Sequence, residues 1–215
     1  MKELVIFGNT NQADMAHYYF ENDSEYKVVA FVVDDEYYKE SLFNKKPIIP
    51  YSKMLLEYPP EKYDCFVAIG YTKKNTIREN VYKRIKDQGY YLPTYISSKA
   101  TIFNTLIIGD NCFVLEDNTI QPFSVIGSNV VLWSGNHLGH HAIIEDNCFI
   151  TSHVVISGGV KVRRNTFIGV NSTIRDHIEI AEYGIIGANS WINKSTVPYG
   201  VYSNKGTELR GVDAL

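Results

Sequence analysis

The sequence predicts an α/β domain followed by an all-β parallel β-helix, and two observations indicate this fold class. In residues 1–92, short apolar runs alternate with helix-like segments, which is typical of a parallel sheet with crossover helices. From Ile96 to Ile192, every sixth residue is Ile, Leu or Val, at all 17 positions. A period of six matches neither a helix nor a simple strand, and it is typical of a β-helix built from hexapeptides.

The first half, residues 1–92, contains the elements of a small Rossmann-like sheet. Its apolar runs predict strands at Leu4–Phe7, Val28–Val33 and Cys65–Ile69. The segments between and after them predict helices, the second capped by Ser52 and the last ended by Gly89, over Ala13–Asn22, Ser52–Glu57 and Asn75–Gln88. The carboxyl ends of the three strands should then meet at one edge of the sheet, where open α/β sheets bind ligands.

The second half, residues 93–215, contains the repeat and a C-terminal cap. Three residues after many of the periodic aliphatics stands a residue that tolerates a positive φ, namely Asn111, Asn129, Gly135, Asn147, Gly159, Asn165, Asn171 and Asn189. We expect a tight corner at each of these positions. Three hexapeptides make a triangular coil of about 18 residues, so residues 96–194 form about five and a half coils and residue n lies over residue n+18.

The composition argues against several function classes. The 215 residues are 45% hydrophobic and 21% charged, with a net charge of −3. We therefore expect a globular protein without the basic surplus that nucleic acids or anionic membranes attract. No apolar run approaches the roughly 20 residues of a transmembrane helix, and Leu4–Phe7 is too short for a signal peptide. Three cysteines without a CxxC pair are typical of a reduced compartment, so we expect a cytoplasmic protein.

Polar residues follow each of the three predicted strands, at Gly8–Gln12, at Asp34 and Asp35, and at Gly70–Lys74. A helix start with free N–H groups suits a phosphate, and an acidic residue after the second strand suits a ribose or a base edge. Gly8 is the single glycine of its loop. The GxGxxG motif of NAD-binding domains is therefore absent, which argues against NAD, and the loop by itself fits a structural role as well as a functional one.

Four of the six histidines lie within 17 residues, at His137, His140, His141 and His153. The stacking rule puts Gly158 over His140 and Gly159 over His141 at a coil corner, where a glycine pair leaves the backbone open to a ligand. A neutral imidazole can take a proton from an amine or hydroxyl that attacks a thioester, and a backbone N–H can support the oxyanion. The cluster therefore suggests acyl transfer, with His140 as the base.

This combination of a short α/β domain, hexapeptides and the His140 segment resembles the hexapeptide-repeat sugar O- and N-acyltransferases. These include the bacterial N-acetyltransferases of UDP-4-amino-sugar (bacillosamine) synthesis, GDP-perosamine N-acetyltransferases and sialic acid O-acetyltransferases. The resemblance covers essentially the whole chain, and it implies a left-handed β-helix, whereas the general crossover rule would favour the opposite hand.

The resemblance also implies roles for individual residues. His140 matches the catalytic histidine and Gly158 the glycine that binds the acetyl carbonyl, while His141 stands where the family often has an orienting carboxylate. That carboxylate could instead come from Glu116, Asp117, Glu145 or Asp146. The nucleotide-sugar would contact Gly8, Asn9, Thr10, Asp34 or Asp35, Gly70, Asn75 and Arg78. Acetyl-CoA would lie between two β-helices of a homotrimer, near His153, Gly158, Gly159, Gly169, Asn171 and Ala188.

We therefore expect an acetyl-CoA-dependent N-acetyltransferase that acts on a nucleotide-linked amino sugar, a 4-amino-4,6-dideoxyhexose, for surface glycan synthesis. Three alternatives remain open. The same machinery could acetylate a sugar hydroxyl, as in sialic acid O-acetylation. His137, His140 and His153 could bind zinc as in γ-class carbonic anhydrases, although the leading interpretation has no metal site. Finally, the chain could be a non-catalytic scaffold that binds a nucleotide-sugar.

Overall fold

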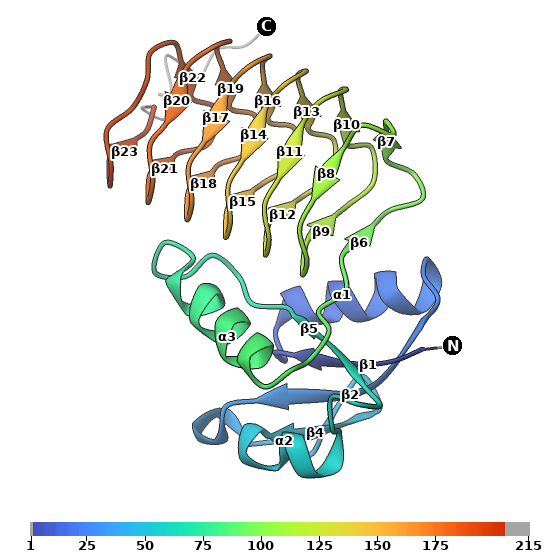
Figure 1. Ribbon diagram of the computed structural model, residues 1–215. Coiled ribbons are helices and arrows are strands. Elements are labelled where there is room, and N and C mark those ends of the chain that lie inside the picture. The colour runs from blue at the N-terminus through green and yellow to red at the C-terminus, as the bar shows by residue number, and fades with distance from the viewer. Residues whose placement is uncertain (1, 205–215) are drawn as a thin grey trace, which may run out of the picture.

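The computed structural model describes residues 2–204, in two regions that pack against each other (Figure 1). The N-terminal region is a five-stranded sheet of order β3-β4-β2-β1-β5. Its strands are β1 (Lys2–Phe7), β2 (Tyr26–Val33), β3 (Leu42–Phe43), β4 (Lys46–Pro50) and β5 (Asp64–Val67). All neighbours in this sheet run parallel except β3 and β4, so the expected parallel sheet is present.

The sequence does not predict β3 and β4. The β4 segment has prolines at both ends of its short apolar core, at Pro47 and Pro50, and proline normally argues against a strand inside a sheet. Here β3 covers only two residues of β4, and Ile48 and Ile49 are buried between the sheet and its helices. The burial of these two side chains therefore stabilises a strand here although the prolines disfavour one.

The helices lie close to their expected positions. They are α1 (Asn11–Asn22), α2 (Tyr51–Glu57) and α3 (Thr76–Asp87), with a 3₁₀ turn, η1 (Asp35–Tyr37). The expected cap of α2 is wrong, because Pro50 holds the N-cap position. The Ser52 hydroxyl instead donates to Asp35 Oδ1 at 2.5 Å. Gly89 follows α3 with a φ of +88°, as expected for a residue that ends a helix.

The C-terminal region is a left-handed parallel β-helix with three faces of stacked two-residue strands. Face 1 contains β7 (Thr101–Ile102), β10 (Thr119–Ile120), β13 (His137–Leu138), β16 (Val155–Ile156), β19 (Thr173–Ile174) and β22 (Trp191–Ile192). Face 2 contains β8 (Ile107–Ile108), β11 (Val125–Ile126), β14 (Ile143–Ile144), β17 (Lys161–Val162) and β20 (Glu179–Ile180). Face 3 contains β6 (Tyr95–Ile96), β9 (Phe113–Val114), β12 (Val131–Leu132), β15 (Phe149–Ile150), β18 (Phe167–Ile168), β21 (Ile185–Ile186) and β23 (Val201–Tyr202).

The register of the β-helix follows the predicted repeat of 18 residues. His137 pairs with Thr119 on one side and Val155 on the other. All the periodic aliphatics from Ile96 to Ile192 form one core or pack against it. All eight predicted corner residues have a positive φ. Residues 205–215 of the expected C-terminal cap lie outside the described residues.

The N-terminal region covers face 3, below the β-helix in Figure 1. The outward side chains of this face are large and apolar, and Phe113, Val131 and Phe149 are buried in one cluster with α1 and the sheet. Every second residue of a strand points outward, so the same hexapeptides that fill the β-helix core also supply this second core. Faces 1 and 2 contribute no residue to that cluster.

A polar ladder also joins the two regions. At the corner between faces 2 and 3, side-chain amides bond one coil to the next from Asn111 through Asn129 and Asn147 to Asn165. Asn165 donates to Glu79 of α3 at 2.8 Å, while Asn111 bonds to the backbone of Val67 in β5. Buried amides without partners would be costly, so this ladder fixes both α3 and β5 on the β-helix.

Candidate active site

A cavity of about 490 Å³ opens at the carboxyl ends of β1, β2 and β5. This is the sheet edge at which the sequence predicts a ligand. The predicted residues that line it are Gly8, Asn9, Thr10, Asp34 and Gly70. Thr72, within the predicted strand end Gly70–Lys74, also lines it, whereas Tyr37, Lys39 and Ile77 line it but were not predicted. Tyr37 and Lys39 come shortly after Asp34 and Asp35. They would have been predicted if the residues considered after that strand had extended to position 39.

The loop after β1 lines the cavity and leads into α1. Gly8 has a φ of +126°, and a methyl group built on it would lie 2.6 Å from the carbonyl oxygen of Ala68. Only glycine therefore lets the ends of β1 and β5 approach this closely. Thr10 is the N-cap of α1 but makes no side-chain capping bond. The Thr10 hydroxyl and the first turn of α1 can therefore serve an anion in the cavity.

The two acidic residues after β2 have different surroundings. Asp34 lines the cavity, and its Oδ1 accepts a hydrogen bond from Arg84 at 2.6 Å. The Arg84 guanidinium in turn lies 4.1 Å from the centre of the Tyr51 ring. Asp35 instead holds the start of α2 through Ser52. Of the two alternatives, Asp34 is the one that lines the cavity.

Asn75 and Arg78 do not line the cavity, which corrects their expected contact with a nucleotide-sugar. Both are fully buried in the junction with the β-helix. Arg78 donates to the carbonyl oxygens of Asn129, Asn147 and Cys148, and to Asn75 Oδ1. Burial lowers the pKa of the Arg78 guanidinium to about 10. From sequence alone, a polar helix start that binds a ligand looks the same as one that binds a neighbouring domain.

The histidine pair lies at the corner between faces 1 and 2. A methyl group built on Gly158 would lie 2.8 Å from both Cε1 and Nε2 of His140. The Gly159 N–H donates to the carbonyl oxygen of His140 at 2.9 Å, so the predicted stacking of the glycine pair over the histidines is observed. The Nε2 edge of His140 therefore faces bare backbone, and a side chain at position 158 would displace the imidazole.

The backbone of Gly158 offers a hydrogen-bond donor at this corner. Among residues 2–204, no group accepts a hydrogen bond from its N–H. By contrast, the Gly159 N–H donates to the carbonyl oxygen of His140. The backbone N–H of His140 donates to Gln121 Oε1 at 2.9 Å. A substrate oxygen beside the His140 ring could accept a hydrogen bond from Gly158.

His141 is the residue that contacts the other nitrogen of His140. The two Nδ1 atoms lie 3.1 Å apart, and the His141 ring packs on Phe123 with ring centres 4.9 Å apart. His141 has a φ of +59°, which turns its side chain back toward its neighbour. Both imidazoles are exposed, so a substrate can reach them.

The four carboxylates considered as partners of His140 lie elsewhere. Glu116 accepts from Tyr19 and Ser134, and Asp117 is on the same corner as Glu116, between faces 3 and 1. Glu145 pairs with Arg163 at 2.7 Å, and Asp146 accepts from the Ser128 N–H. The group in contact with His140 is therefore His141.

The remaining residues expected to bind acetyl-CoA lie at a different corner, between faces 3 and 1. They are His153, Gly169, Asn171 and Ala188. His153 packs over Gly135, where a methyl group would lie 2.6 Å from its Nδ1. Within one chain, face 1 separates these residues from Gly158 and Gly159. The expected cofactor set is thus divided between the two edges of face 1.

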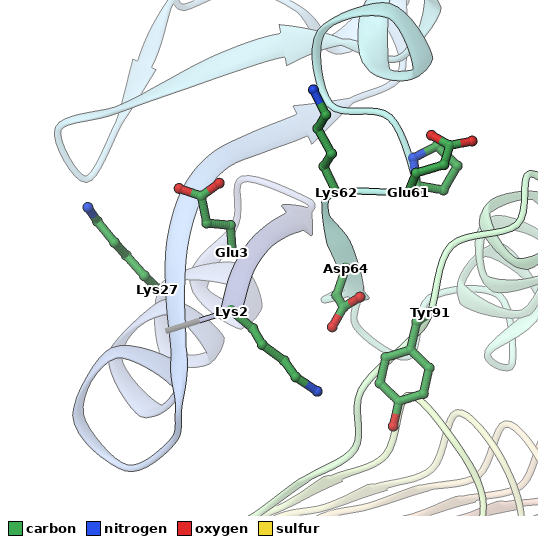
Figure 2. Close-up of a pocket in the computed structure, with 8 residues that line it drawn as sticks. Lys2, Glu3, Lys27, Glu61, Lys62, Asp64 and Tyr91 are labelled. Atoms are coloured by element: carbon green, nitrogen blue, oxygen red, sulfur yellow. The ribbon is translucent and has the colours of Figure 1, made fainter.

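A larger cavity, of about 690 Å³, lies at the opposite edge of the N-terminal sheet (Figure 2). Figure 2 shows Lys2, Lys27 and Lys62 around it, with Glu3 and Asp64 between them. It is formed at the amino ends of the strands, away from every residue that the sequence predicts as functional. Its mixed charges favour no single ligand, so the smaller cavity is the better candidate.

Two searches for other kinds of site cover residues 2–204. Within that range, no three His, Cys, Asp or Glu side chains of one chain are grouped so that they could hold a metal ion. In the same range, every helix is too short or too polar to cross a membrane.

Two family models match the chain. The PglD N-terminal domain matches residues 3–85, and the bacterial transferase hexapeptide (six repeats) matches residues 123–158. The first covers the sheet with the 490 Å³ cavity, and the second spans the coils from Phe123 to Gly158.

Solved structures share the fold over nearly the whole chain. The acetyltransferase domain of PglB from Neisseria gonorrhoeae is 21% identical with a TM-score of 0.79, covering 91% of this chain and 93% of that one. PerB from Caulobacter crescentus, in complex with CoA and GDP-perosamine, is 21% identical with a TM-score of 0.80, covering 94% and 92%. WeeI from Acinetobacter baumannii is 17% identical with a TM-score of 0.69, covering 94% of each. These findings confirm the resemblance and the fold expected from the sequence.

Proposed function

We propose that this protein is an acetyl-CoA-dependent N-acetyltransferase that acts on a nucleotide-linked amino sugar. The observation that carries the proposal is that the Nε2 edge of His140 faces the position of a Cβ on Gly158, a residue whose N–H has no partner among residues 2–204. Acyl transfer to an amine needs a base and an oxyanion donor about 3 Å from one reacting centre. The similarity to PerB, whose structure contains CoA and GDP-perosamine, supports the same substrates here.

The contact between the two histidines is compatible with His140 Nε2 as the base. One of two Nδ1 atoms at 3.1 Å must donate and the other accept. If His140 carries its hydrogen on Nδ1, its Nε2 lone pair faces Gly158 and is free. His141 then accepts at Nδ1 and carries its hydrogen on Nε2. His141 thus takes over the orienting role of the family's carboxylate.

The reaction follows from this arrangement. The sugar amine attacks the thioester carbon while His140 Nε2 takes a proton from the nitrogen. The carbonyl oxygen gains negative charge and accepts the Gly158 N–H. The C–S bond then breaks, CoA leaves as the thiolate and takes up the proton held at His140 Nε2, so the amide product remains and the base is neutral again. Such a base typically contributes about 10²- to 10⁴-fold to the rate.

The 490 Å³ cavity would hold the nucleotide end of the acceptor. The start of α1 and Thr10 suit the diphosphate, Asp34 suits a ribose hydroxyl or a base N–H, and Lys39 adds a positive charge. The sugar would then extend from the sheet edge toward the amine's reaction site.

A homotrimer is part of the proposal, because one chain holds the two sites apart. The N-terminal region covers face 3, whereas His140 lies at the corner opposite that face, between faces 1 and 2. A neighbouring copy would have to bring its own α/β domain or β-helix edge to His140. Packing between copies would also bury Ile107 and Phe123, which are 65% and 57% exposed on faces and corners of the first coils.

The acceptor class is a 4-amino-4,6-dideoxyhexose, by likeness to the perosamine enzyme. A product of this kind serves surface glycan synthesis, and acetyl-CoA and nucleotide-sugars as substrates are consistent with a cytoplasmic enzyme.

The test is thiol release from acetyl-CoA with UDP-, dTDP- and GDP-linked 4-amino sugars, with wild type and His140→Ala compared. Release with one nucleotide-sugar, reduced at least 100-fold in a folded variant, supports reaction, donor, acceptor and base together. Acetylation of a hydroxyl acceptor only would replace the N-acetyltransferase with an O-acetyltransferase. Nucleotide-sugar binding without thiol release for either acceptor would favour the scaffold.

A further inference from the structure

His177 lies at the same corner as His140, one coil beyond the glycine pair. The His177 N–H donates to the carbonyl oxygen of Gly158 at 3.0 Å, just as the Gly159 N–H donates to His140. Hydrogen bonds thus join His140, the glycine pair and His177 in three successive coils. His177 is 37 residues from His140 in the sequence and was not among the predicted site residues, although the rule n+18 applied to Gly159 leads to it.

The His177 imidazole faces the glycine pair from the side opposite His140. A methyl group built on Gly159 would lie 2.5 Å from Nδ1 and 2.8 Å from Cε1 of His177. The equivalent methyl on Gly158 would meet the His140 ring at 2.8 Å. The glycine pair is therefore a slot of bare backbone between two imidazoles, and a side chain at either position would displace one of them.

The His177 ring is free to act on a ligand. Its side chain is 73% exposed, and its nearest charged partner is Asp176, whose Oδ2 lies 3.9 Å from Nε2. That distance is too long for a hydrogen bond. An imidazole in this setting offers one N–H donor and one nitrogen acceptor at once.

We propose that His177 binds the acyl donor, at the arm that carries the thioester. This inference rests on the proposed function. There, His140 Nε2 serves the acceptor amine on one side of the slot, and the Gly158 N–H, in the slot itself, serves the acyl oxygen. The thioester sulfur occupies another substituent position of the same carbon and leads away from the amine. His177 is the side chain on that far side, and the amide groups of the donor arm match its donor and acceptor nitrogens.

The test uses CoA as the probe, in calorimetric titrations of wild type, His177→Gly and His177→Phe, together with steady-state kinetics. Glycine suits the φ of +55° at this position. Phenylalanine keeps a ring without nitrogens, and the chain already holds Phe123 at a φ of +66° in the same column of corners. Lys45→Gly is the matched control, because Lys45 is exposed in the turn between β3 and β4, has a φ of +63° and belongs to the other region.

Both His177 variants should raise the Kd for CoA and the KM for acetyl-CoA about 3- to 10-fold, as expected for one lost hydrogen bond. The KM for the nucleotide-sugar and kcat at saturating donor should stay within about twofold, which a general loss of structure would not produce. An unchanged Kd for CoA in either folded variant overturns the role of His177 alone. A wild-type protein that binds no CoA overturns the proposed function itself.

Discussion

The Nδ1 atoms of His140 and His141 lie 3.1 Å apart, within hydrogen-bond distance of each other. This contact connects adjacent residues at one corner, and the positive φ of His141 makes it possible. A neutral imidazole accepts a hydrogen bond less strongly than a carboxylate does. We therefore expect His141 to set the tautomer of His140 while stabilising its protonated form only modestly.

Replacing His141 by glycine tests this role. Glycine keeps the backbone conformation and removes the acceptor, so kcat should fall by about 3- to 10-fold, the range for one neutral hydrogen bond. His141→Asp should restore kcat or exceed wild type, since a carboxylate accepts more strongly. Steady-state rates for the three proteins decide the matter, and equal rates in all three would exclude an orienting role for His141.

Gly158→Ala should reduce activity by steric displacement of His140. The added methyl would lie 2.8 Å from the imidazole, so we expect kcat to fall at least 10-fold, because misplacement by about 1 Å can cost 10²-fold. The double variant with His140→Ala has no ring to displace. Its Tm should therefore exceed that of Gly158→Ala alone, and a Tm equal to or below it would contradict the contact.

Gly70→Phe should fill the nucleotide cavity without disturbing the fold. A Cβ at Gly70 meets nothing within 4 Å, so the ring can enter the cavity that Gly70 lines. Binding of a nucleoside diphosphate, measured by calorimetry, should weaken at least 10-fold with little change in Tm. Leu56→Phe is the control, because Leu56 is 85% exposed and lies away from the cavity. Undiminished binding in the Gly70 variant would place the nucleotide elsewhere.

Arg78→Met should destabilise the junction between the two regions. The substitution leaves the buried carbonyls of Asn129, Asn147 and Cys148 without this donor, at a cost of about 2–5 kcal/mol. Urea unfolding measures the change. Lys83→Met, on the same helix, removes a 61% exposed partner of Glu79 and should cost at most about 1 kcal/mol. Similar losses in both variants would contradict the central role of Arg78.

Acid should weaken the contact between α1 and the first coil. The Ser98 N–H and then the Tyr95 hydroxyl hold the pKa of Asp23 below its ordinary value. A carboxyl with a lowered folded pKa stabilises the protein above its unfolded pKa of about 3.9, and this stabilisation is lost as the pH falls further. The Tm of wild type should therefore fall more steeply than that of Asp23→Asn below about pH 4. Parallel curves would show that Asp23 contributes nothing to acid sensitivity.

Much of the fold follows from sequence periodicity, because an aliphatic at every sixth residue determines both the inward ladder and the register of successive coils. The same register led from His140 to Gly158. It fails where packing between regions decides a residue's role. Asn75 and Arg78 are polar residues at a helix start, and nothing in their spacing distinguishes a ligand contact from the junction that buries them. His177 was missed because it is distant in sequence from the other histidines, although the stack places it at the same corner, one coil beyond the glycine pair.

The asparagine ladder bears on how such a chain can be recombined. At its two ends the ladder forms hydrogen bonds with the Glu79 carboxylate and with the Val67 backbone. The first turn of α3 and the end of β5 are therefore complementary to these four coils. In a chimera that joins this β-helix to a different α/β domain, the side-chain amides of Asn111 and Asn165 would be buried at the junction without these hydrogen-bond partners. An exchange of α/β domains to change the substrate should therefore succeed only when the chimera keeps residues 64–79 of this protein together with its β-helix.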